Sequence, residues 1–291
     1  MELAADFKAL LSSIQPDDDD VADAKDAHET VREQLRTDEE FKEAHKDTFL
    51  SGSYARHTAI NDINDVDVIC IVDIDQSITE PEVVLAWTQS ILGKYYKKTK
   101  RQGRSVGAQA DKGVWLDIVP ATPVTTDDGP LWIPDREAKQ WVQTHPKGQI
   151  KAASDKNKET NGYYVQVVKL MKFWRDRLPT ESRRLKSYIL ESLVHRTIGS
   201  SSSSHAAAVV NVLEGIESSY GAYRGTGMAP VISDPGYASV NVAKHWEAGD
   251  FTDFMNQVKT AATTARKALG STNETPSRRL WRQIFGATFG Q

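Results

Sequence analysis

The sequence contains one cysteine in 291 residues, so no disulfide can form within the chain. It has no apolar run near the roughly 18 residues that a membrane-spanning helix requires, and its N-terminus has no signal-peptide pattern. No group of cysteines and histidines has the spacing of zinc ligands. These absences predict a cytoplasmic protein without a membrane partner, in which Cys70 is a small buried hydrophobe.

The chain also has no excess of positive charge. The net charge of −4 argues against a general, sequence-independent grip on nucleic-acid backbones, so no stable nucleic-acid partner is expected. The local exception is the segment 94–104, which contains six basic residues and no acidic one. It is either a solvated helix end or a surface that attracts phosphate or a partner.

The apolar patterns predict an α+β fold in two lobes. The first lobe, 1–150, is expected to contain two N-terminal helices, a mixed sheet and a helix over Pro81–Lys98. Two of its strands, 105–110 and 114–119, are joined by Asp111-Lys112-Gly113, a strong hairpin signal. The second lobe, 151–291, is expected to be helical, and the active site is expected in the cleft between the lobes.

Some of the expected elements are less regular. The proline-rich segment 120–160 is predicted to be irregular and to form the boundary between the lobes. The other expected helices are 1–14, 20–45, 161–177, 184–198, 205–220, 241–269 and 276–285.

Three aspartates stand out on predicted strands. Asp65 and Asp67 are two residues apart, so they project from the same face of a strand. Asp117 follows 50 residues after Asp67, on the second strand of the hairpin. Adjacent buried carboxylates are costly unless a cation neutralises them, and Mg²⁺ prefers oxygen ligands. The spacing therefore predicts a two-metal site for nucleotidyl transfer, in which Asp117 also accepts the proton of an attacking hydroxyl.

A glycine–serine pair precedes the aspartates by 13 residues. Gly52 lets the backbone approach a triphosphate closely, and the Ser53 hydroxyl with nearby N–H groups can donate to it. Arg56 has two open interpretations: it contacts phosphate or base, or it supports the local fold through a carboxylate such as Asp62.

The motifs Gly52–Ile60, with Asp65-x-Asp67, and Trp115–Ala121 resemble the DNA polymerase β-like nucleotidyltransferase superfamily. Within it, the chain is most similar to the bacterial cyclic-oligonucleotide synthases of anti-phage defence, the cGAS/DncV-like nucleotidyltransferases. The resemblance extends through most of the chain. It is carried further by Ile133–Arg136, Pro146–Gly148, Asp234-Pro235 and Asn241–Ala243.

This resemblance implies an enzyme that uses Mg²⁺ or Mn²⁺ to condense ATP or other nucleoside triphosphates into a cyclic di- or trinucleotide, with release of pyrophosphate. It implies an effector that responds to the product, and regulatory protein partners. It places Lys172 on the β- and γ-phosphates, with Lys169 nearby, and Ser187 on the terminal phosphate. An apolar stripe through Met171 is expected to leave both lysines on another helix face.

Two alternatives remain open. One keeps the fold but transfers the nucleotide to an RNA end, a protein hydroxyl or a small molecule. The other is a non-catalytic scaffold or sensor that retains the nucleotide fold. Formation of a product from nucleotides alone separates the main hypothesis from the first alternative, and turnover separates it from the second.

Overall fold

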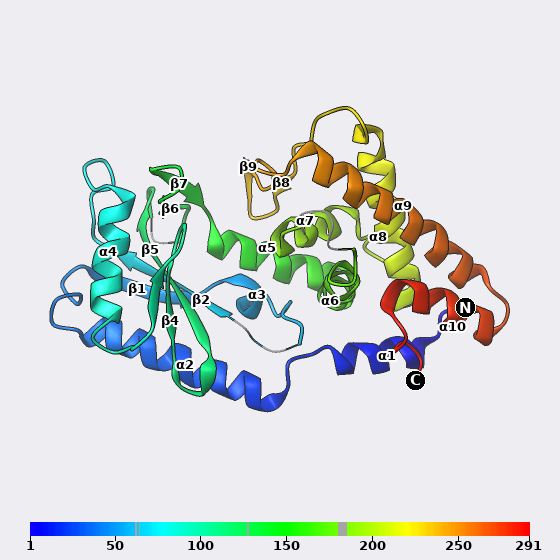
Figure 1. Cartoon of the computed structure of the whole chain (residues 1–291), viewed down its shortest axis with the longest axis horizontal. Coiled ribbons are helices and arrows are strands. Elements are labelled where there is room, and N and C mark those ends of the chain that lie inside the picture. Colours follow the sequence, from blue (N-terminus) through cyan, green and yellow to red (C-terminus); the bar gives the residue numbers. More distant parts are fainter. Residues whose placement is uncertain (62, 64, 127, 180–184) are drawn as a thin grey trace. The chain divides into compact units, whose positions relative to one another are not determined.

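The structure is a computed structural model that describes residues 1–61, 63, 65–126, 128–179 and 185–291 (Figure 1). Contacts within the chain divide it into two compact units. One is Pro16–Lys151, and the other joins Met1–Gln15 to Ala152–Gln291.

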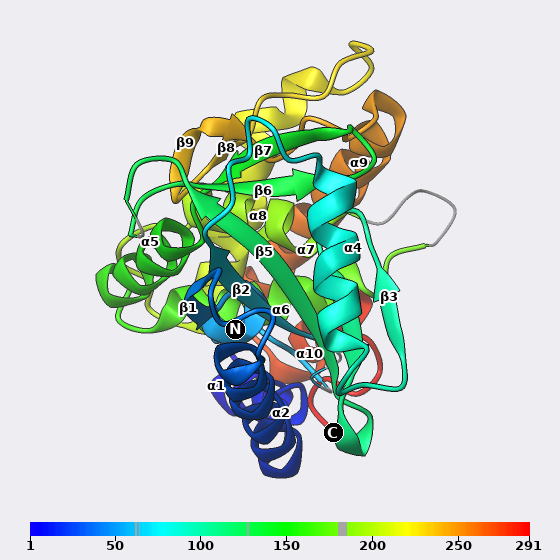
Figure 2. The same cartoon turned by 90° about the vertical axis from the view of Figure 1, so that its left-hand side faces the viewer.

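The first unit is built on a mixed sheet whose strands follow the order β1-β2-β5-β4-β3, with β6 attached to β5 and β7 to β6. The pair β2–β5 is parallel and the other pairs are antiparallel. The strands are β1 (His45–Leu50), β2 (Asp65–Val72), β3 (Thr99–Arg101), β4 (Val106–Gln109), β5 (Trp115–Pro123), β6 (Leu131–Asp135) and β7 (Gln140–Thr144). Figure 2 shows β5 running through this sheet beside β2.

Two helices cover one face of the sheet, α2 (Asp18–Thr37) and α4 (Pro81–Leu92). Every second residue of β2, from Val66 to Val72, packs into a core shared with both helices. The side chains in between, Ile69 and Ile71, pack on the opposite face against β5 and β6. The same alternation places Asp65 and Asp67 on that opposite face, away from α2 and α4.

The buried cysteine belongs to the first of these cores. Cys70 is fully buried, and burial raises the pKa of its thiol to about 12. The prediction of a small buried hydrophobe is confirmed.

The helices of the second unit pack mainly against one another. They are α1 (Ala4–Ser13), α6 (Tyr163–Arg175), α7 (Ser187–Thr197), α8 (His205–Tyr220), α9 (Ala248–Gly270) and α10 (Glu274–Phe285), with a hairpin of β8 (Ser233–Asp234) and β9 (Tyr237–Asn241). The boundary between the units falls inside α5 (Pro146–Glu159). Among the residues that the structure describes, none of the helices combines the length and apolar content needed to cross a bilayer.

The first helix belongs to this second unit. Phe7 of α1 makes edge-to-face contacts with Trp281, Phe285 and Phe289 near the C-terminus. The predicted first lobe, 1–150, includes residues 1–15, which instead pack with the C-terminal part of the chain. Local periodicity identified the helix, but its packing partners lie about 150 to 280 residues away, in α6, α8 and the C-terminal segment.

The predicted α+β fold class is confirmed. The prediction that differs most from the structure is the irregular segment 120–160. This segment is ordered as the end of β5, then β6, β7 and α5. Pro120 is tolerated in β5 because it lies beyond the pairing with β4, which ends at Ile118, and before the pairing with β6, which begins at Thr122. Pro146 is the first residue of α5, where a missing N–H costs nothing.

Three helix boundaries also differ. The predicted helix 20–45 ends at Thr37, and the helix over 81–98 ends at Leu92 before Gly93, which leaves 99–101 to form β3. The predicted helix 241–269 begins only at Ala248. The helix expected over 184–198 is observed from Ser187, and its predicted first residue lies outside the described residues.

Candidate active site

Three aspartates share one face of the sheet in the first unit. The parallel strands β2 and β5 align Asp67 with Asp117 and Asp65 with Trp115. Register partners in adjacent strands point to the same face, so Asp65, Asp67 and Asp117 project together. The predicted juxtaposition of the hairpin aspartate with the aspartate pair is present in the structure.

These carboxylates interact electrostatically. Burial, followed by the charges of Asp65 and Asp117, raises the pKa of Asp67 to about 6, and Arg56 opposes the shift. Burial and then Asp65 also raise the pKa of Asp117, while hydrogen bonds from Trp115 and Gln102 lower it. The protein alone leaves concentrated negative charge at this position.

An oxygen-binding cation suits this donor set. In the described part of the chain no three carboxylate, imidazole or thiolate groups are gathered into a ready-made metal site. The three aspartates therefore lie near one another without forming a complete set of metal ligands. Mg²⁺ ordinarily takes one or two carboxylates, with waters and substrate phosphates completing its shell, so an open set of aspartates fits it.

Without divalent cations, the contribution of Asp67 to the stability of the protein is expected to fall as the pH rises from about 4 to 6. An acid with a raised pKa in the folded state binds more protons than in the unfolded state over this window, so deprotonation disfavours folding. The shift from 3.8 to about 6 limits this contribution to about 3 kcal/mol. Urea unfolding at several pH values should show the fall for the wild type and a weaker one for Asp67→Asn.

The matched control for this experiment is Asp73→Asn, because the Asp73 carboxylate is exposed and pairs with Lys46 at the surface. Its profile should follow the wild type. An Asp67→Asn profile that also follows the wild type would contradict the raised pKa.

The glycine–serine turn packs directly on the aspartate strand. Gly52 begins the short helix α3 (Gly52–Ala55) with φ of 67°, in the left-handed region that favours glycine. A Cβ at this position would overlap the Asp67 carboxylate. The backbone N–H of Ser51 donates to the Asp67 carbonyl at 2.8 Å, and the Thr58 N–H donates to the Ser53 carbonyl at 2.9 Å. The turn and the strand that carries Asp65 and Asp67 therefore form one packed element.

Gly52→Ala is expected to lower the free energy of unfolding by about 1–3 kcal/mol through backbone strain, and further through overlap with Asp67. Gly113→Ala is the matched control, because Gly113 also has positive φ but a Cβ there meets open space. Thermal unfolding of both variants separates strain from overlap. Equal losses would show that the contact with Asp67 costs nothing.

Arg56 is buried, with 8% exposure, and its charge acts on Asp67. This placement favours the interpretation in which Arg56 supports the local fold through a carboxylate. The carboxylate suggested from sequence, Asp62, lies outside the described residues.

Lys172 differs from its predicted placement. Its ammonium is 2.7 Å from a carboxylate oxygen of Glu191 in α7, and both side chains are almost completely buried. The expectation of an open helix face was wrong because α6 is buried nearly all round, with Leu170, Met171, Phe173 and Trp174 also in the core.

Lys169 and Ser187 are nearer the surface. Lys169 is half-buried, and burial followed by the charge of Lys172 lowers its pKa. Ser187 begins α7, and its hydroxyl accepts a hydrogen bond of 2.7 Å from Nη1 of Arg175. Sequence reasoning missed Arg175, although it continues the spacing of three from Lys169 through Lys172. The triphosphate role of these residues stays a prediction, because they belong to a different unit from the aspartates.

Gln102 was also missed. Its Nε2 donates to Oδ1 of Asp117 at 2.6 Å. The sequence predicts either a solvated helix end or a surface that attracts phosphate or a partner for segment 94–104, and neither predicts that Gln102 approaches the hairpin. Other members of that segment form ion pairs: Lys94 with the buried Asp38 and the exposed Glu40, and Arg104 with the buried Asp135.

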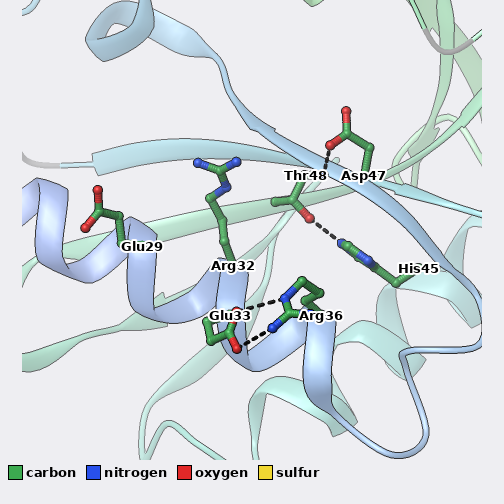
Figure 3. Close-up of a pocket in the computed structure, with 7 residues that line it drawn as sticks. All are labelled: Glu29, Arg32, Glu33, Arg36, His45, Asp47 and Thr48. Carbon is green, nitrogen blue, oxygen red and sulfur yellow. Dashed lines mark hydrogen bonds and ion pairs between the residues drawn. The ribbon is translucent and has the colours of Figure 1, made fainter.

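A pocket of about 280 Å³ lies elsewhere, between α2 and β1 (Figure 3). Arg32, Arg36, Glu29 and Glu33 line it from the helix, and His45 donates to or accepts from Thr48 across its other side at 2.6 Å. Thr48 of β1 is the register partner of Cys70, whose side chain packs on the α2 face of the sheet, so the Thr48 side chain lies on that face too. The pocket is thus not part of the aspartate site.

Comparison with known proteins agrees with this arrangement. Residues 1–157 match the Second Messenger Oligonucleotide or Dinucleotide Synthetase domain. The chain is 34% identical to a cyclic AMP-AMP-AMP synthase of Acinetobacter, over 97% of this chain and 84% of that protein. It is 30% identical to a cyclic AMP-AMP-GMP synthase of Enterobacter hormaechei, over 99% of this chain and 92% of that protein.

Solved structures share the fold. CdnC of E. coli MS115-1, determined with ATP, is similar with a TM-score of 0.80 and 17% identity, over 100% of both chains. The CD-NTase CdnG of Bradyrhizobium diazoefficiens, in complex with GTP, is similar with a TM-score of 0.81 and 15% identity, over 97% of this chain and 95% of that one.

Proposed function

We propose that this chain, which belongs to the Second Messenger Oligonucleotide or Dinucleotide Synthetase family, makes a cyclic trinucleotide that contains at least two adenylates. Its general activity is that of a nucleotidyltransferase that condenses nucleoside triphosphates into a cyclic oligonucleotide. The ring size and the adenine content are inferred from the two relatives at 34% and 30% identity. The observation that carries the chemistry is the register of Asp67 with Asp117.

Asp65, Asp67 and Asp117 would hold the divalent cations, and Asp117 would accept the proton from the attacking ribose hydroxyl. When bound, Mg²⁺ or Mn²⁺ supplies charge stabilisation at the attacking and leaving oxygens. The strands keep the three carboxylates on one face, while Gly52 leaves room for Asp67. Arg56 steadies Asp67 from the buried side.

The donor triphosphate would be held by the Ser53 hydroxyl and the backbone of its turn. Lys169 and Ser187 are the proposed contacts from the helical unit, with Arg175 beside Ser187. The ammonium group of Lys172 already forms an ion pair with Glu191. A phosphate-binding role for Lys172 therefore needs an experiment that separates it from this ion pair.

The proposal is tested by incubating the full chain with Mg²⁺ and ATP, GTP or both, and then with phosphatase. We expect a resistant product whose mass is that of a three-nucleotide ring with two or three adenylates. A two-nucleotide ring would overturn the proposed ring size, and a product that forms only with an added RNA, protein or small-molecule acceptor would favour the rival transferase. Nucleotide binding without turnover would favour the non-catalytic alternative.

A regulatory protein partner and an effector that responds to the product remain predictions. One structural neighbour, E. coli CdnC, has been solved in a complex with a HORMA protein, at 17% identity to this chain. If the isolated chain binds ATP but is inactive, addition of a protein of that kind is the first condition to try. Product formation on its addition would support regulation.

A further inference from the structure

A row of residues crosses the sheet beside the third aspartate. Asp67 of β2 aligns with Asp117 of β5, which aligns with Gly107 of β4, which in turn aligns with Lys100 of β3. All four positions face the same side because they are cross-strand partners. Strands β4 and β3 therefore form the part of this sheet face that lies next to Asp117. Their side chains have no role in the reaction as proposed above.

Gln102 approaches Asp117 from one side of this sheet face. It follows β3 directly, and its backbone N–H donates to the Ser105 carbonyl at 2.8 Å. Its side-chain amide donates to Oδ1 of Asp117 at 2.6 Å, in a half-buried environment. The short contact between a neutral donor and a carboxylate is strong and directional.

Trp115 approaches from the other side. It lies two residues before Asp117 on β5, so both side chains project from the same face. The indole N–H is near enough to the Asp117 carboxyl to lower its pKa as a hydrogen-bond donor. The indole lies over Gly107, where a Cβ would meet Nε1 and the adjoining ring carbons. Gly107 thus provides the space that lets the indole reach the carboxylate.

We propose that Gln102 and Trp115 are positioning residues that hold the Asp117 carboxylate in the orientation facing Asp67. A lone aspartate side chain samples several rotamers, and two donors on opposite sides restrict it to one. Both donors are neutral. They orient the carboxylate without cancelling its charge, whereas a lysine or arginine in their place would compete with a bound cation.

The inference rests on the proposed function for its kinetic test. Gln102→Ala and Trp115→Phe each remove the N–H donor, and Trp115→Phe keeps an aromatic ring over Gly107. We expect kcat to fall by about 10- to 100-fold, as for other groups that orient metal ligands, while KM for ATP and the melting temperature stay near the wild type. Gln102→Glu should lose more than Gln102→Ala, because it places a second negative charge against Asp117.

Gln89→Ala is the matched control. Gln89 is also a half-buried glutamine, and its side-chain amide donates to Thr99 Oγ1 of β3 at 3.3 Å. It lies on α4, and its amide bonds β3 rather than Asp117. Its kcat should match the wild type. A loss equal to that of Gln102→Ala would show that the anchoring of β3 matters and would overturn the positioning role, as would a fall in KM alone.

A second readout does not depend on activity. In crystal structures without metal, the Asp117 carboxylate should have one orientation in the wild type and more than one in Gln102→Ala. An unchanged, single orientation in the variant would overturn the inference. If the wild type makes no cyclic product, the proposed function fails, yet this structural comparison still decides whether Gln102 orients Asp117.

Discussion

Asp67→Asn is expected to abolish the formation of cyclic product, with a loss of at least about a hundredfold to a thousandfold in kcat. Asp67 lies between Asp65 on its own strand and Asp117 on the next, so its replacement removes the central anionic oxygen of the set. Asparagine keeps the size of the side chain and the packing on Gly52. Product measured by mass spectrometry after phosphatase treatment checks the expectation.

The same variant should be at least as stable as the wild type in metal-free buffer at pH 7. Burial and two neighbouring carboxylates disfavour the charged form of Asp67, and the amide removes that cost. Added Mg²⁺ should raise the melting temperature of the wild type more than that of the variant. Retained turnover in Asp67→Asn, beside a fully active Asp73→Asn control, would refute the assignment of the site.

The second large effect concerns the buried pair Lys172–Glu191. Lys172→Ala is expected to lower the free energy of unfolding by about 3–5 kcal/mol, because it leaves the Glu191 charge buried without its ammonium partner. Adding Glu191→Gln to Lys172→Ala should recover much of that loss. Urea unfolding of the two single variants and the double variant gives the interaction energy.

The double variant also decides what Lys172 does. If the pair is structural, the double variant should bind a non-hydrolysable ATP analogue with nearly wild-type affinity. If Lys172 reaches the triphosphate, affinity stays low although stability has recovered. Arg266→Gln in the same unit is the control: its ion pair with Glu214 is largely exposed, so its removal should change stability by less than about 1 kcal/mol.

The aspartate site was readable from sequence because strand geometry is local. A period of two fixes that Asp65 and Asp67 share a face, and the turn at Asp111–Gly113 fixes the strand that carries Asp117. That the hairpin can pair beside the aspartate pair was a prediction, supported by the family resemblance. The parallel register of β2 with β5, which joins residues 50 positions apart, is seen only in the structure.

The supporting residues were not readable, because their roles depend on contacts distant in sequence. Glu191 is 19 residues from Lys172, and the apolar stripe of α6 gave no sign that the opposite side of the helix is also buried. Gln102 lay in a segment whose basic composition suggested a solvated helix end, whereas Gly93 ends that helix early. Prolines in 120–160 suggested irregular structure, although Pro120 and Pro123 lie in β5, Pro134 lies in β6 and Pro146 begins α5.

The contact between Gly52 and the Asp67 carboxylate links two positions that sequence alone presents as separate motifs. A larger residue at 52 overlaps the Asp67 carboxylate, so it is accommodated better when residue 67 is smaller, and then the carboxylate is lost. Among relatives with this backbone, we expect the two positions to change together. Chains that retain the aspartate should keep glycine, and chains that have lost catalysis should tolerate side chains at 52. In a homologous sequence of unknown activity, the residue at position 52 therefore indicates whether the aspartate site has been retained.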